Sequence, residues 1–293
     1  MKTESIPTVD QLRVCLSEGR RQGKTVGLVP TMGALHEGHG CLIEQARGEC
    51  DVLVVSVYVN PLQFGPEEDL TCYPRDLASD LLFCEQRGVD VVFAPSNEEI
   101  YSDTQHTFVE HGVEGAALCG EHRPGHFRGV ATVVLKLFNI VQPNRAYFGE
   151  KDIQQLAVLG RMTKDFNLPI DIVEVPTRRE PDGLAISSRN QYLNSEERRA
   201  AGVLYRALRI ARQRIADGNL DPSVATRGAL TVLELEPLAR VEYLEVVDPG
   251  LMQSVDEIAG PVRVVGAIRI GSTRLIDNVL CEMPKKVRSR RKK

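Results

Sequence analysis

A run of nine residues, DVLVVSVYV at 51–59, constrains the fold of this chain more than any other segment. It is almost entirely apolar and rich in β-branched residues, which is typical of a strand buried on both faces of a parallel sheet. Shorter runs of this kind, at 26–29, 89–94, 145–148 and 170–175, alternate with segments that read as helices. Strands that alternate with helices predict a doubly wound α/β domain with a mostly parallel sheet.

The composition changes near TRREPD, residues 177–182, and this change predicts a domain boundary. We expect a first domain over 1–178 and a smaller α+β domain over 179–284, which the length of 293 residues allows. The second domain should contain helices near 195–216 and 222–235 and strands near 240–247, 262–270 and 273–280. Residues 285–293, KKVRSRRKK, are predicted to form a solvated, disordered basic tail.

Charge and composition exclude several classes of protein. The net charge is −4, and removing the seven positive charges of the tail leaves −11 for the rest. An acidic body argues against nucleic acid as the main partner, although a nucleic-acid or nuclear address stays open for the tail. Seven cysteines without a C-x-x-C pair do not predict a disulfide framework or a zinc ribbon. No apolar stretch is as long as a membrane span or resembles a signal peptide, so we expect a reducing, cytoplasmic compartment and no membrane.

The first candidate site follows the apolar run at 26–29. The strand pattern breaks at Pro30, small residues follow at Gly33 and Ala34, and a helical pattern begins near His36 and His39. A turn and a helix N-terminus present unpaired N–H groups to an anion, and histidines three apart share one helical face. We interpret the pair as part of a nucleotide phosphate site. Structural histidines and a metal site are the alternatives.

Further polar residues follow later strand ends. Asn60 and Gln63 stand at the carboxyl end of the 51–59 strand, where open α/β sheets bind their ligands. Lys151 follows the 145–148 strand, with Gly149 freeing the backbone, so that an ammonium and helix N–H groups can meet one phosphate. Gln155 lies one helical turn further on and could reach the same cavity.

Two hydroxyls and a guanidinium stand together beyond the predicted boundary, at Ser187, Ser188 and Arg189. These are the donors that a polyphosphate needs, and a loop between domains can close over a nucleotide. An N-cap for the next helix is the alternative interpretation.

The chain resembles the pantothenate synthetase family, the pantoate–β-alanine ligases. The resemblance runs from about Val26 to Asn278 in seven ordered motifs. They are PTMGALHEGH (30–39), VNPLQFG (59–65), YPRD (73–76), RPGHFRGV (123–130), YFGEKDIQQL (147–156), DGLAISSRNQYL (182–193) and RLIDN (274–278). H-x-G-H alone would indicate only the wider nucleotidyltransferase superfamily.

The resemblance implies a Rossmann-like doubly wound parallel sheet of the HxGH nucleotidyltransferase type, a homodimer, and a reaction. ATP, (R)-pantoate and β-alanine would give pantothenate, AMP and pyrophosphate through a pantoyl adenylate, with Mg²⁺. The implied catalytic residues are His39 as proton donor, His36, Lys151 and Arg189. The implied ATP site comprises Pro30, Thr31, Met32, Gly33, Ala34, Leu35, His36, Glu37, Gly38, His39, Gly149, Glu150, Lys151, Asp152, Arg178, Ile186, Ser187, Ser188 and Arg189. The implied pantoate and β-alanine site comprises Gln63, Gln155, Asn60 and Arg123, and Asp80 would bind the metal.

Three positions depart from the family pattern. Gly40 stands where a larger apolar residue is usual, and Arg178 stands where many relatives have valine. Ser79 precedes Asp80 where an acidic pair is usual. Two other functions stay open: an adenylyltransferase of the same superfamily that acts on a phosphorylated acceptor, and a non-catalytic nucleotide-binding or scaffold protein.

Overall fold

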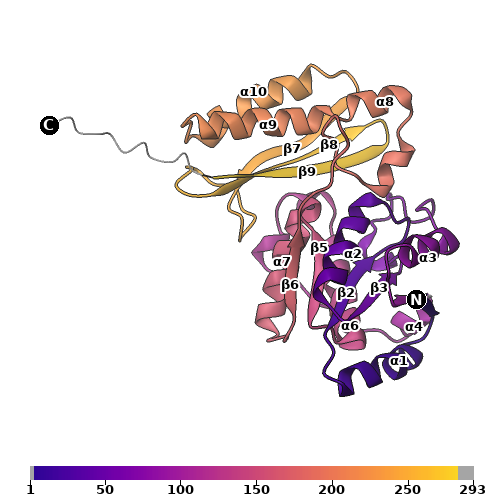
Figure 1. Ribbon diagram of the computed structural model, residues 1–293. Coiled ribbons are helices and arrows are strands. Elements are labelled where there is room, and N and C mark those ends of the chain that lie inside the picture. The colour runs from indigo at the N-terminus through magenta and orange to yellow at the C-terminus, as the bar shows by residue number, and fades with distance from the viewer. Residues whose placement is uncertain (1–2, 283–293) are drawn as a thin grey trace. The chain divides into compact units, whose positions relative to one another are not determined.

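The computed structural model describes residues 3–282, so the predicted basic tail lies outside the described residues. Two compact units divide the chain (Figure 1). Unit 1 comprises residues 1–180 and 185–188, and unit 2 comprises residues 181–184 and 189–293. The predicted division after residue 178 therefore lies close to the observed division, in which the chain passes between the two units three times, after residues 180, 184 and 188. The predicted roles, an ATP- and pantoate-binding domain over 1–178 and a lid domain over 179–284, stay predictions.

A six-stranded parallel sheet in the order β1-β4-β3-β2-β5-β6 forms the centre of unit 1. Its strands are β1 (Glu4–Ile6), β2 (Val26–Thr31), β3 (Val52–Val57), β4 (Val91–Phe93), β5 (Arg145–Gly149) and β6 (Asp171–Val175). The helices are α1 (Val9–Arg21), α2 (Glu37–Glu49), α3 (Leu77–Glu85), α4 (Asn97–Ile100), α5 (Cys119–His122), α6 (His126–Val141) and α7 (Ile153–Asp165). Short 3₁₀ helices are η1 (Pro61–Gln63), η2 (Val113–Gly115), η3 (Glu150–Asp152) and η4 (Ser188–Tyr192), of which η4 runs from unit 1 into unit 2.

Both faces of this sheet are covered, as the continuous apolar runs predict. Val29 and Val55 belong to one core cluster with residues of α2, such as Ile43. Leu28 and Val54 are fully buried as well. Because successive side chains of a strand point to opposite faces, these two lie on the other side of the sheet. The predicted doubly wound α/β fold is confirmed.

The order of the strands reverses between β2 and β5. From β2 the chain proceeds outward through β3 and β4, and β5 then pairs with the other side of β2, where Leu28 lies opposite Ala146. In open α/β sheets, ligands bind at the carboxyl ends of the strands beside such a reversal. The segments that follow β2 and β5 are those with the histidine pair and Lys151.

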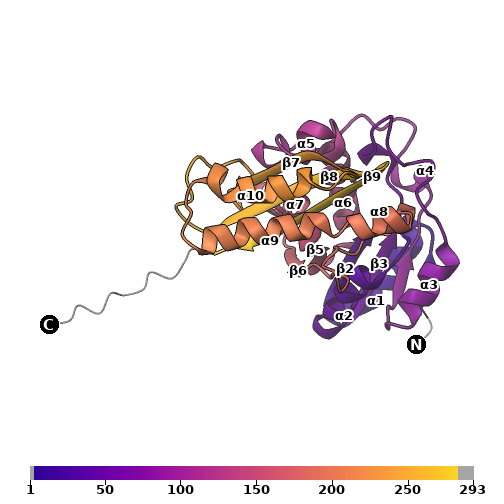
Figure 2. The same ribbon diagram turned by 90° about the horizontal axis from the view of Figure 1, so that it is seen from above.

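Unit 2 is an antiparallel sheet with helices packed on it (Figure 2). The sheet comprises β7 (Ala239–Val247), β8 (Val262–Ile270) and β9 (Thr273–Cys281), and the helices are α8 (Ser195–Ala200), α9 (Val203–Ala216) and α10 (Pro222–Glu234). Leu208 and Ile215 of α9 share a buried cluster with Val264 and Ile268 of β8. The predicted small α+β module is confirmed.

Three expectations about elements were wrong. β2 continues through Pro30 to Thr31 instead of breaking there, because its pairing with β5 ends at Leu28 and only β3 pairs beyond. The apolar run at 130–141 predicts a helix that starts at Val130. Helix α6 begins at His126 instead, directly after Gly125, whose φ of 82° sets the turn. The strand β1 was not expected, since three residues are too short for a pattern.

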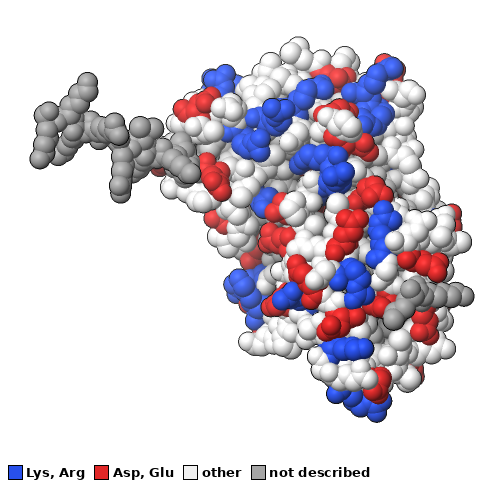
Figure 3. All heavy atoms as spheres, in the orientation of Figure 1, with Lys and Arg blue, Asp and Glu red and all other residues white. Residues whose placement is uncertain are grey.

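Basic and acidic side chains are interspersed on the face seen in Figure 3. Among residues 3–282, none of the helices is both long and apolar enough to cross a membrane.

Candidate active site

The turn between β2 and α2 is held by a buried carboxylate from α3. Asp80 Oδ2 accepts the backbone N–H of Ala34 at 3.1 Å, and Oδ1 accepts that of Leu35 at 2.7 Å. Ala34 has φ 50°, which costs energy in a residue other than glycine, so these bonds secure a strained turn. Gly33 has φ 79°, and a Cβ there would lie 2.8 Å from Asp80 Oδ2. The glycine therefore permits the carboxylate to approach.

Asp80 was predicted to bind the metal. It is 3% exposed, and burial raises the pKa of its carboxyl above the usual value. Both oxygens already accept backbone N–H groups, and within residues 3–282 no group of three or more His, Cys, Asp or Glu side chains could hold a metal ion. A Mg²⁺ held mainly by substrate phosphates and water, as is common, fits this arrangement better than a protein cage. Metal binding by Asp80 stays a prediction.

His36 and His39 lie together at the start of α2. His36 is the N-cap and not, as expected, part of the helix. Its Nδ1 accepts the N–H of Gly38 at 3.2 Å, and His39 Nδ1 accepts the N–H of His36 at 3.3 Å. The ring centroids are 4.0 Å apart, in a stacked arrangement. Because each Nδ1 is an acceptor, each neutral ring has its proton on Nε2 and can donate it to a ligand.

Both histidines are neutral at physiological pH. Burial, followed by the charge of Lys151, lowers the pKa of His36 to about 4. Burial, followed by His36 and Lys151, lowers the pKa of His39 well below its ordinary value. The charge of Lys151 therefore acts on both rings. The lysine that follows β5 is thus within electrostatic range of the histidines that follow β2.

Lys151 lies in η3, where its Nζ is 3.4 Å from Asp152 Oδ1. Gly149 has an ordinary φ of −80°, and a Cβ there would meet nothing within 4 Å. The backbone at this position thus does not need glycine, contrary to our expectation. Glycine instead leaves space at the end of β5.

Gly38 keeps a gap between His36 and the loop of residues 185–188. A Cβ on Gly38 would lie 2.9 Å from His36 Cε1 and 3.8 Å from the carbonyl oxygen of Ile186. In the same loop, Ser188 Oγ is 3.0 Å from the hydroxyl of Tyr73, which is buried. This loop therefore lies next to the histidine turn.

Helix α8 does not use the Ser-Ser-Arg cluster as its N-cap, because Asn194 caps it. Ile186 N donates to the carbonyl oxygen of Arg178 at 3.0 Å, which brings these two predicted ATP residues together. Arg189 belongs to unit 2, so its role at the phosphates stays a prediction.

Gln63 lies at the carboxyl end of β3, in η1, and contacts the histidine turn. Its Nε2 is 2.9 Å from Met32 Sδ, and its Oε1 accepts from Asn60 Nδ2 at 3.0 Å. Asn60 is 1% exposed, and its other contacts are with Gly129, Leu62 and Tyr101. Gln155 lies in the first turn of α7 and is half-buried, whereas its neighbour Gln154 is buried and bonded to the backbone of residues 114–119.

Arg123 was predicted to bind substrate. Its Nε and Nη2 donate to the two carboxylate oxygens of Glu68 at 2.6 and 2.7 Å. Its Nη1 is 3.0 Å from His126 Nε2. Burial, followed by the Arg123 charge, lowers the pKa of His126 to about 3. The motif RPGHFRGV contains His126, but the sequence predicts no role for this residue, because its partner Gln63 is distant in sequence.

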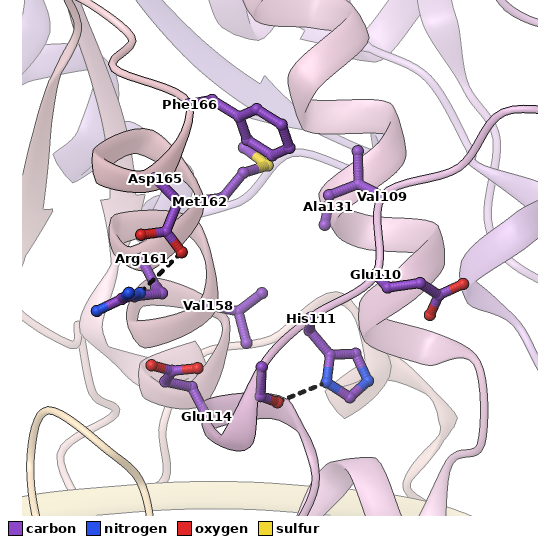
Figure 4. A pocket seen from close by; sticks show the side chains of 11 residues that line it. Val109, Glu110, His111, Glu114, Ala131, Val158, Arg161, Met162, Asp165 and Phe166 are labelled. Carbon is purple, nitrogen blue, oxygen red and sulfur yellow. Dashed lines mark hydrogen bonds and ion pairs between the residues drawn. The ribbon is translucent and has the colours of Figure 1, made fainter.

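A separate hollow lies between α6, α7 and residues 109–114 (Figure 4). Val109, Ala131, Val158, Met162 and Phe166 give it an apolar lining, and Arg161 pairs with Asp165 at its edge. None of the predicted site residues lines it.

Comparisons with known proteins agree with the resemblance. The family model of pantoate-β-alanine ligase matches residues 4–280. Pantothenate synthetase 1 of Bradyrhizobium diazoefficiens is 54% identical over 276 residues, 94% of this chain and 97% of the relative. The crystal structure of the Thermus thermophilus pantothenate synthetase has a TM-score of 0.90 and 47% identity, covering 94% of this chain and 99% of that one.

A Francisella tularensis pantoate-β-alanine ligase, described as complexed with β-γ ATP and β-alanine, has a TM-score of 0.79 and 36% identity, covering 95% of this chain and 97% of that one. The family match spans nearly the whole chain, and the relatives are matched nearly end to end. The chain therefore belongs to the pantoate–β-alanine ligase family.

Proposed function

We propose that this protein joins (R)-pantoate to β-alanine at the expense of ATP, through a pantoyl adenylate, and releases AMP and pyrophosphate. The observation that carries the proposal is the meeting of His36, His39 and Lys151 beside the reversal of the sheet. The identity of the substrates is inferred from the family to which the chain belongs. The same fold with different polar groups at this edge would not favour a triphosphate.

In the first step, a carboxylate oxygen of pantoate attacks the α-phosphorus and pyrophosphate departs. Negative charge grows on the phosphoryl oxygens, and preorganised donors stabilise it. His36 and His39 donate from Nε2, Lys151 contributes its positive charge, and the first N–H groups of α2 add the positive end of the helix dipole. We assign His39 as the proton donor.

The ATP site is proposed to extend beyond these groups. It comprises Pro30–His39, Gly149–Asp152, Arg178 and Ile186–Arg189. Mg²⁺ bound to the phosphates would offset their charge when present, and Asp80 is a carboxylate that bonds to the 33–35 turn.

Gln63 and Gln155 are assigned to pantoate. Neutral amides suit its hydroxyl groups, which need hydrogen-bond partners once they are buried. In the second step, the amine of β-alanine attacks the acyl carbon of the adenylate. The C–N bond forms, the bond from the acyl carbon to the phosphate oxygen breaks, AMP leaves and the amine loses a proton. Water must be excluded, since it would hydrolyse the adenylate.

An adenylyltransferase acting on a phosphorylated acceptor would need a spare cation near Gln63. Arg123 is a cation in that region, and Glu68 neutralises it through two hydrogen bonds. This arrangement favours a neutral acceptor pocket and hence the ligase. A homodimer and a cytoplasmic location are expected from the family.

The test is to measure AMP and pyrophosphate release with each substrate omitted in turn. ATP–pyrophosphate exchange should need pantoate but not β-alanine, and AMP release at full rate should need all three substrates. Exchange without pantoate, or turnover with a phosphorylated acceptor in its place, would contradict the proposal. A scaffold protein would show neither exchange nor turnover.

A further inference from the structure

We propose that the first turn of α6, residues 126–129, is a clamp that positions Gln63, with His126 as its positioning residue. Asn60 and Arg123 then act on substrate through this clamp and not by touching it. The inference rests on the proposed function, because it assumes that Gln63 holds pantoate.

The hydrogen-bond roles of the His126 ring follow from its neighbours. Its Nε2 faces Arg123 Nη1 at 3.0 Å, and a guanidinium can only donate, so Nε2 must accept. The proton of the neutral ring is therefore on Nδ1. Nδ1 lies 2.8 Å from the carbonyl oxygen of Gln63 and donates to it. His126 thus has a single tautomer and fixes the backbone of Gln63.

The second half of the clamp is Gly129, one turn along the helix. A Cβ there would collide with the carbonyl group of Leu62 and lie 2.6 Å from Gln63 N. Only glycine lets the helix backbone pack this closely against η1. The carbonyl oxygen of Gly129 also accepts from Asn60 Nδ2 at 3.1 Å, so the two chain segments are bonded as well as packed.

Asn60 transmits this contact to the Gln63 side chain. Its Nδ2 also donates to Gln63 Oε1, and its Oδ1 accepts from the hydroxyl of Tyr101 at 2.8 Å and from Leu62 N at 3.3 Å. Both N–H hydrogens and both lone pairs of the amide are then used. Asn60 has no capacity left for a substrate, but it orients the Gln63 amide.

Arg123 is the outer support of the clamp. Its charge is paired with both oxygens of Glu68, and one N–H holds the His126 ring in place. Gln63, with its Oε1 on Asn60 and its Nε2 on Met32, keeps one N–H and one lone pair unpaired within residues 3–282. Those are the groups that we expect pantoate to use.

Two polar substitutions of His126 separate this role from a merely structural one. The amide nitrogen of His126→Asn sits near the Nδ1 position and keeps the donor to Gln63, whereas His126→Gln reaches toward Arg123 and loses that donor. We expect His126→Gln to raise the KM for pantoate about tenfold, the size of one lost hydrogen bond, with the KM for ATP nearly unchanged. His126→Asn should restore a KM near that of the wild type. His106→Gln, at an exposed histidine, is the control.

A double-mutant cycle with Gln63→Ala completes the test. If His126 acts through Gln63, His126→Gln should raise the KM for pantoate no further in the Gln63→Ala background. Additive effects, equal effects of Asn and Gln, or a parallel rise in the KM for ATP would overturn the clamp. If the wild type forms no pantothenate, the proposed function fails first and the inference falls with it. If only the clamp inference is wrong, the wild type still forms pantothenate.

Discussion

The imidazole rings of His36 and His39 stack with their centroids 4.0 Å apart, and His39 Nδ1 accepts the backbone N–H of His36. One ring caps the helix and the other bonds back to the cap residue. Both are therefore fixed in the Nε2–H tautomer before any ligand arrives. The geometry combines a helix start with two aligned neutral donors.

Binding of ATP should draw protons onto this pair. The phosphates add negative charge beside rings whose pKa values are low, and a nearby anion favours imidazolium. We expect net proton uptake on ATP binding that grows as the pH falls from 7 to 5. Calorimetric titrations in buffers of different ionisation enthalpy would measure it. Buffer-independent heats at pH 5 would contradict this prediction.

Removal of single charged or donor groups should damage turnover more than stability. We expect His39→Ala and Lys151→Ala each to lower kcat by about 10²-fold or more, since each removes a group that we propose stabilises the developing charge. Thermal unfolding should stay within a few degrees of the wild type. In Lys151→Ala, the pKa of His36 should also rise, because a repelling charge is gone. Histidine NMR titration of this variant would measure the change.

Asp80 should matter for the shape of the turn. In Asp80→Ala, the backbone N–H groups of Ala34 and Leu35 lose a buried acceptor, which costs about 2–4 kcal/mol of unfolding free energy by the usual magnitude for charged hydrogen bonds. Urea denaturation would measure this loss. Asp80→Asn keeps one acceptor and should lose about half as much. If both variants kept wild-type stability and lost only magnesium dependence, Asp80 would be a metal ligand instead.

Stability should fall in mild acid because of the neutral histidines. Unfolded histidine binds a proton near pH 6.5, but folded His36 and His126 do so only near pH 4 and 3. Between these limits the unfolded state holds more protons, so each histidine lowers the unfolding free energy by up to about 1.4 kcal/mol per pH unit as the pH falls. The charges acting on the two rings are Lys151, Asp152, Glu37, Arg123 and Glu68.

Urea unfolding at pH 7, 6 and 5 would show this slope, before most carboxylates titrate. His126→Asn should reduce it, since one of the titrating groups is gone. A slope equal to that of the wild type would mean that His126 is protonated in the folded state.

Gly40 and Arg87 should depend on each other. A Cβ on Gly40 would lie 2.9 Å from Arg87 Nε, and Arg87 pairs with Glu37 at 2.7 Å and lies over the ring of Phe83. Arg87 thus occupies the space that a larger residue would need. We expect Gly40→Leu to lower the unfolding free energy by about 1–3 kcal/mol through overpacking. The same change in an Arg87→Ala background should be neutral or stabilising, and equal losses in both backgrounds would refute the coupling.

The fold could be predicted because its signals are local. The run at 51–59 shows that β3 is buried on both faces, and the alternation with helices gives the parallel sheet. The features that the local sequence does not predict depend on partners that are distant along the chain. Pro30 stays in β2 because β5 no longer pairs there, and the ring of His126 bonds to Gln63, a residue 63 positions away.

The residues of the candidate site carry local sequence signals, but the hydrogen bonds between them do not. His36, His39 and Lys151 carry local signals, namely a turn, a helix start and a strand end. The bonds of Asp80 to Leu35 and of Asn60 to Gln63 and Gly129 depend on which elements meet in three dimensions. Residue types alone predict Asn60 as a ligand, but they could not predict that Gln63, Gly129, Leu62 and Tyr101 use all four hydrogen-bonding positions of its amide.

The adjacency of β2 and β5 makes refolding itself observable through catalysis. The histidines and the lysine reach one another only when these two strands, far apart along the chain, have paired. A polypeptide that ends before residue 145 would carry the imidazoles without their ammonium partner. The rate at which ATP–pyrophosphate exchange recovers after dilution from denaturant should thus report when β2 and β5 have paired.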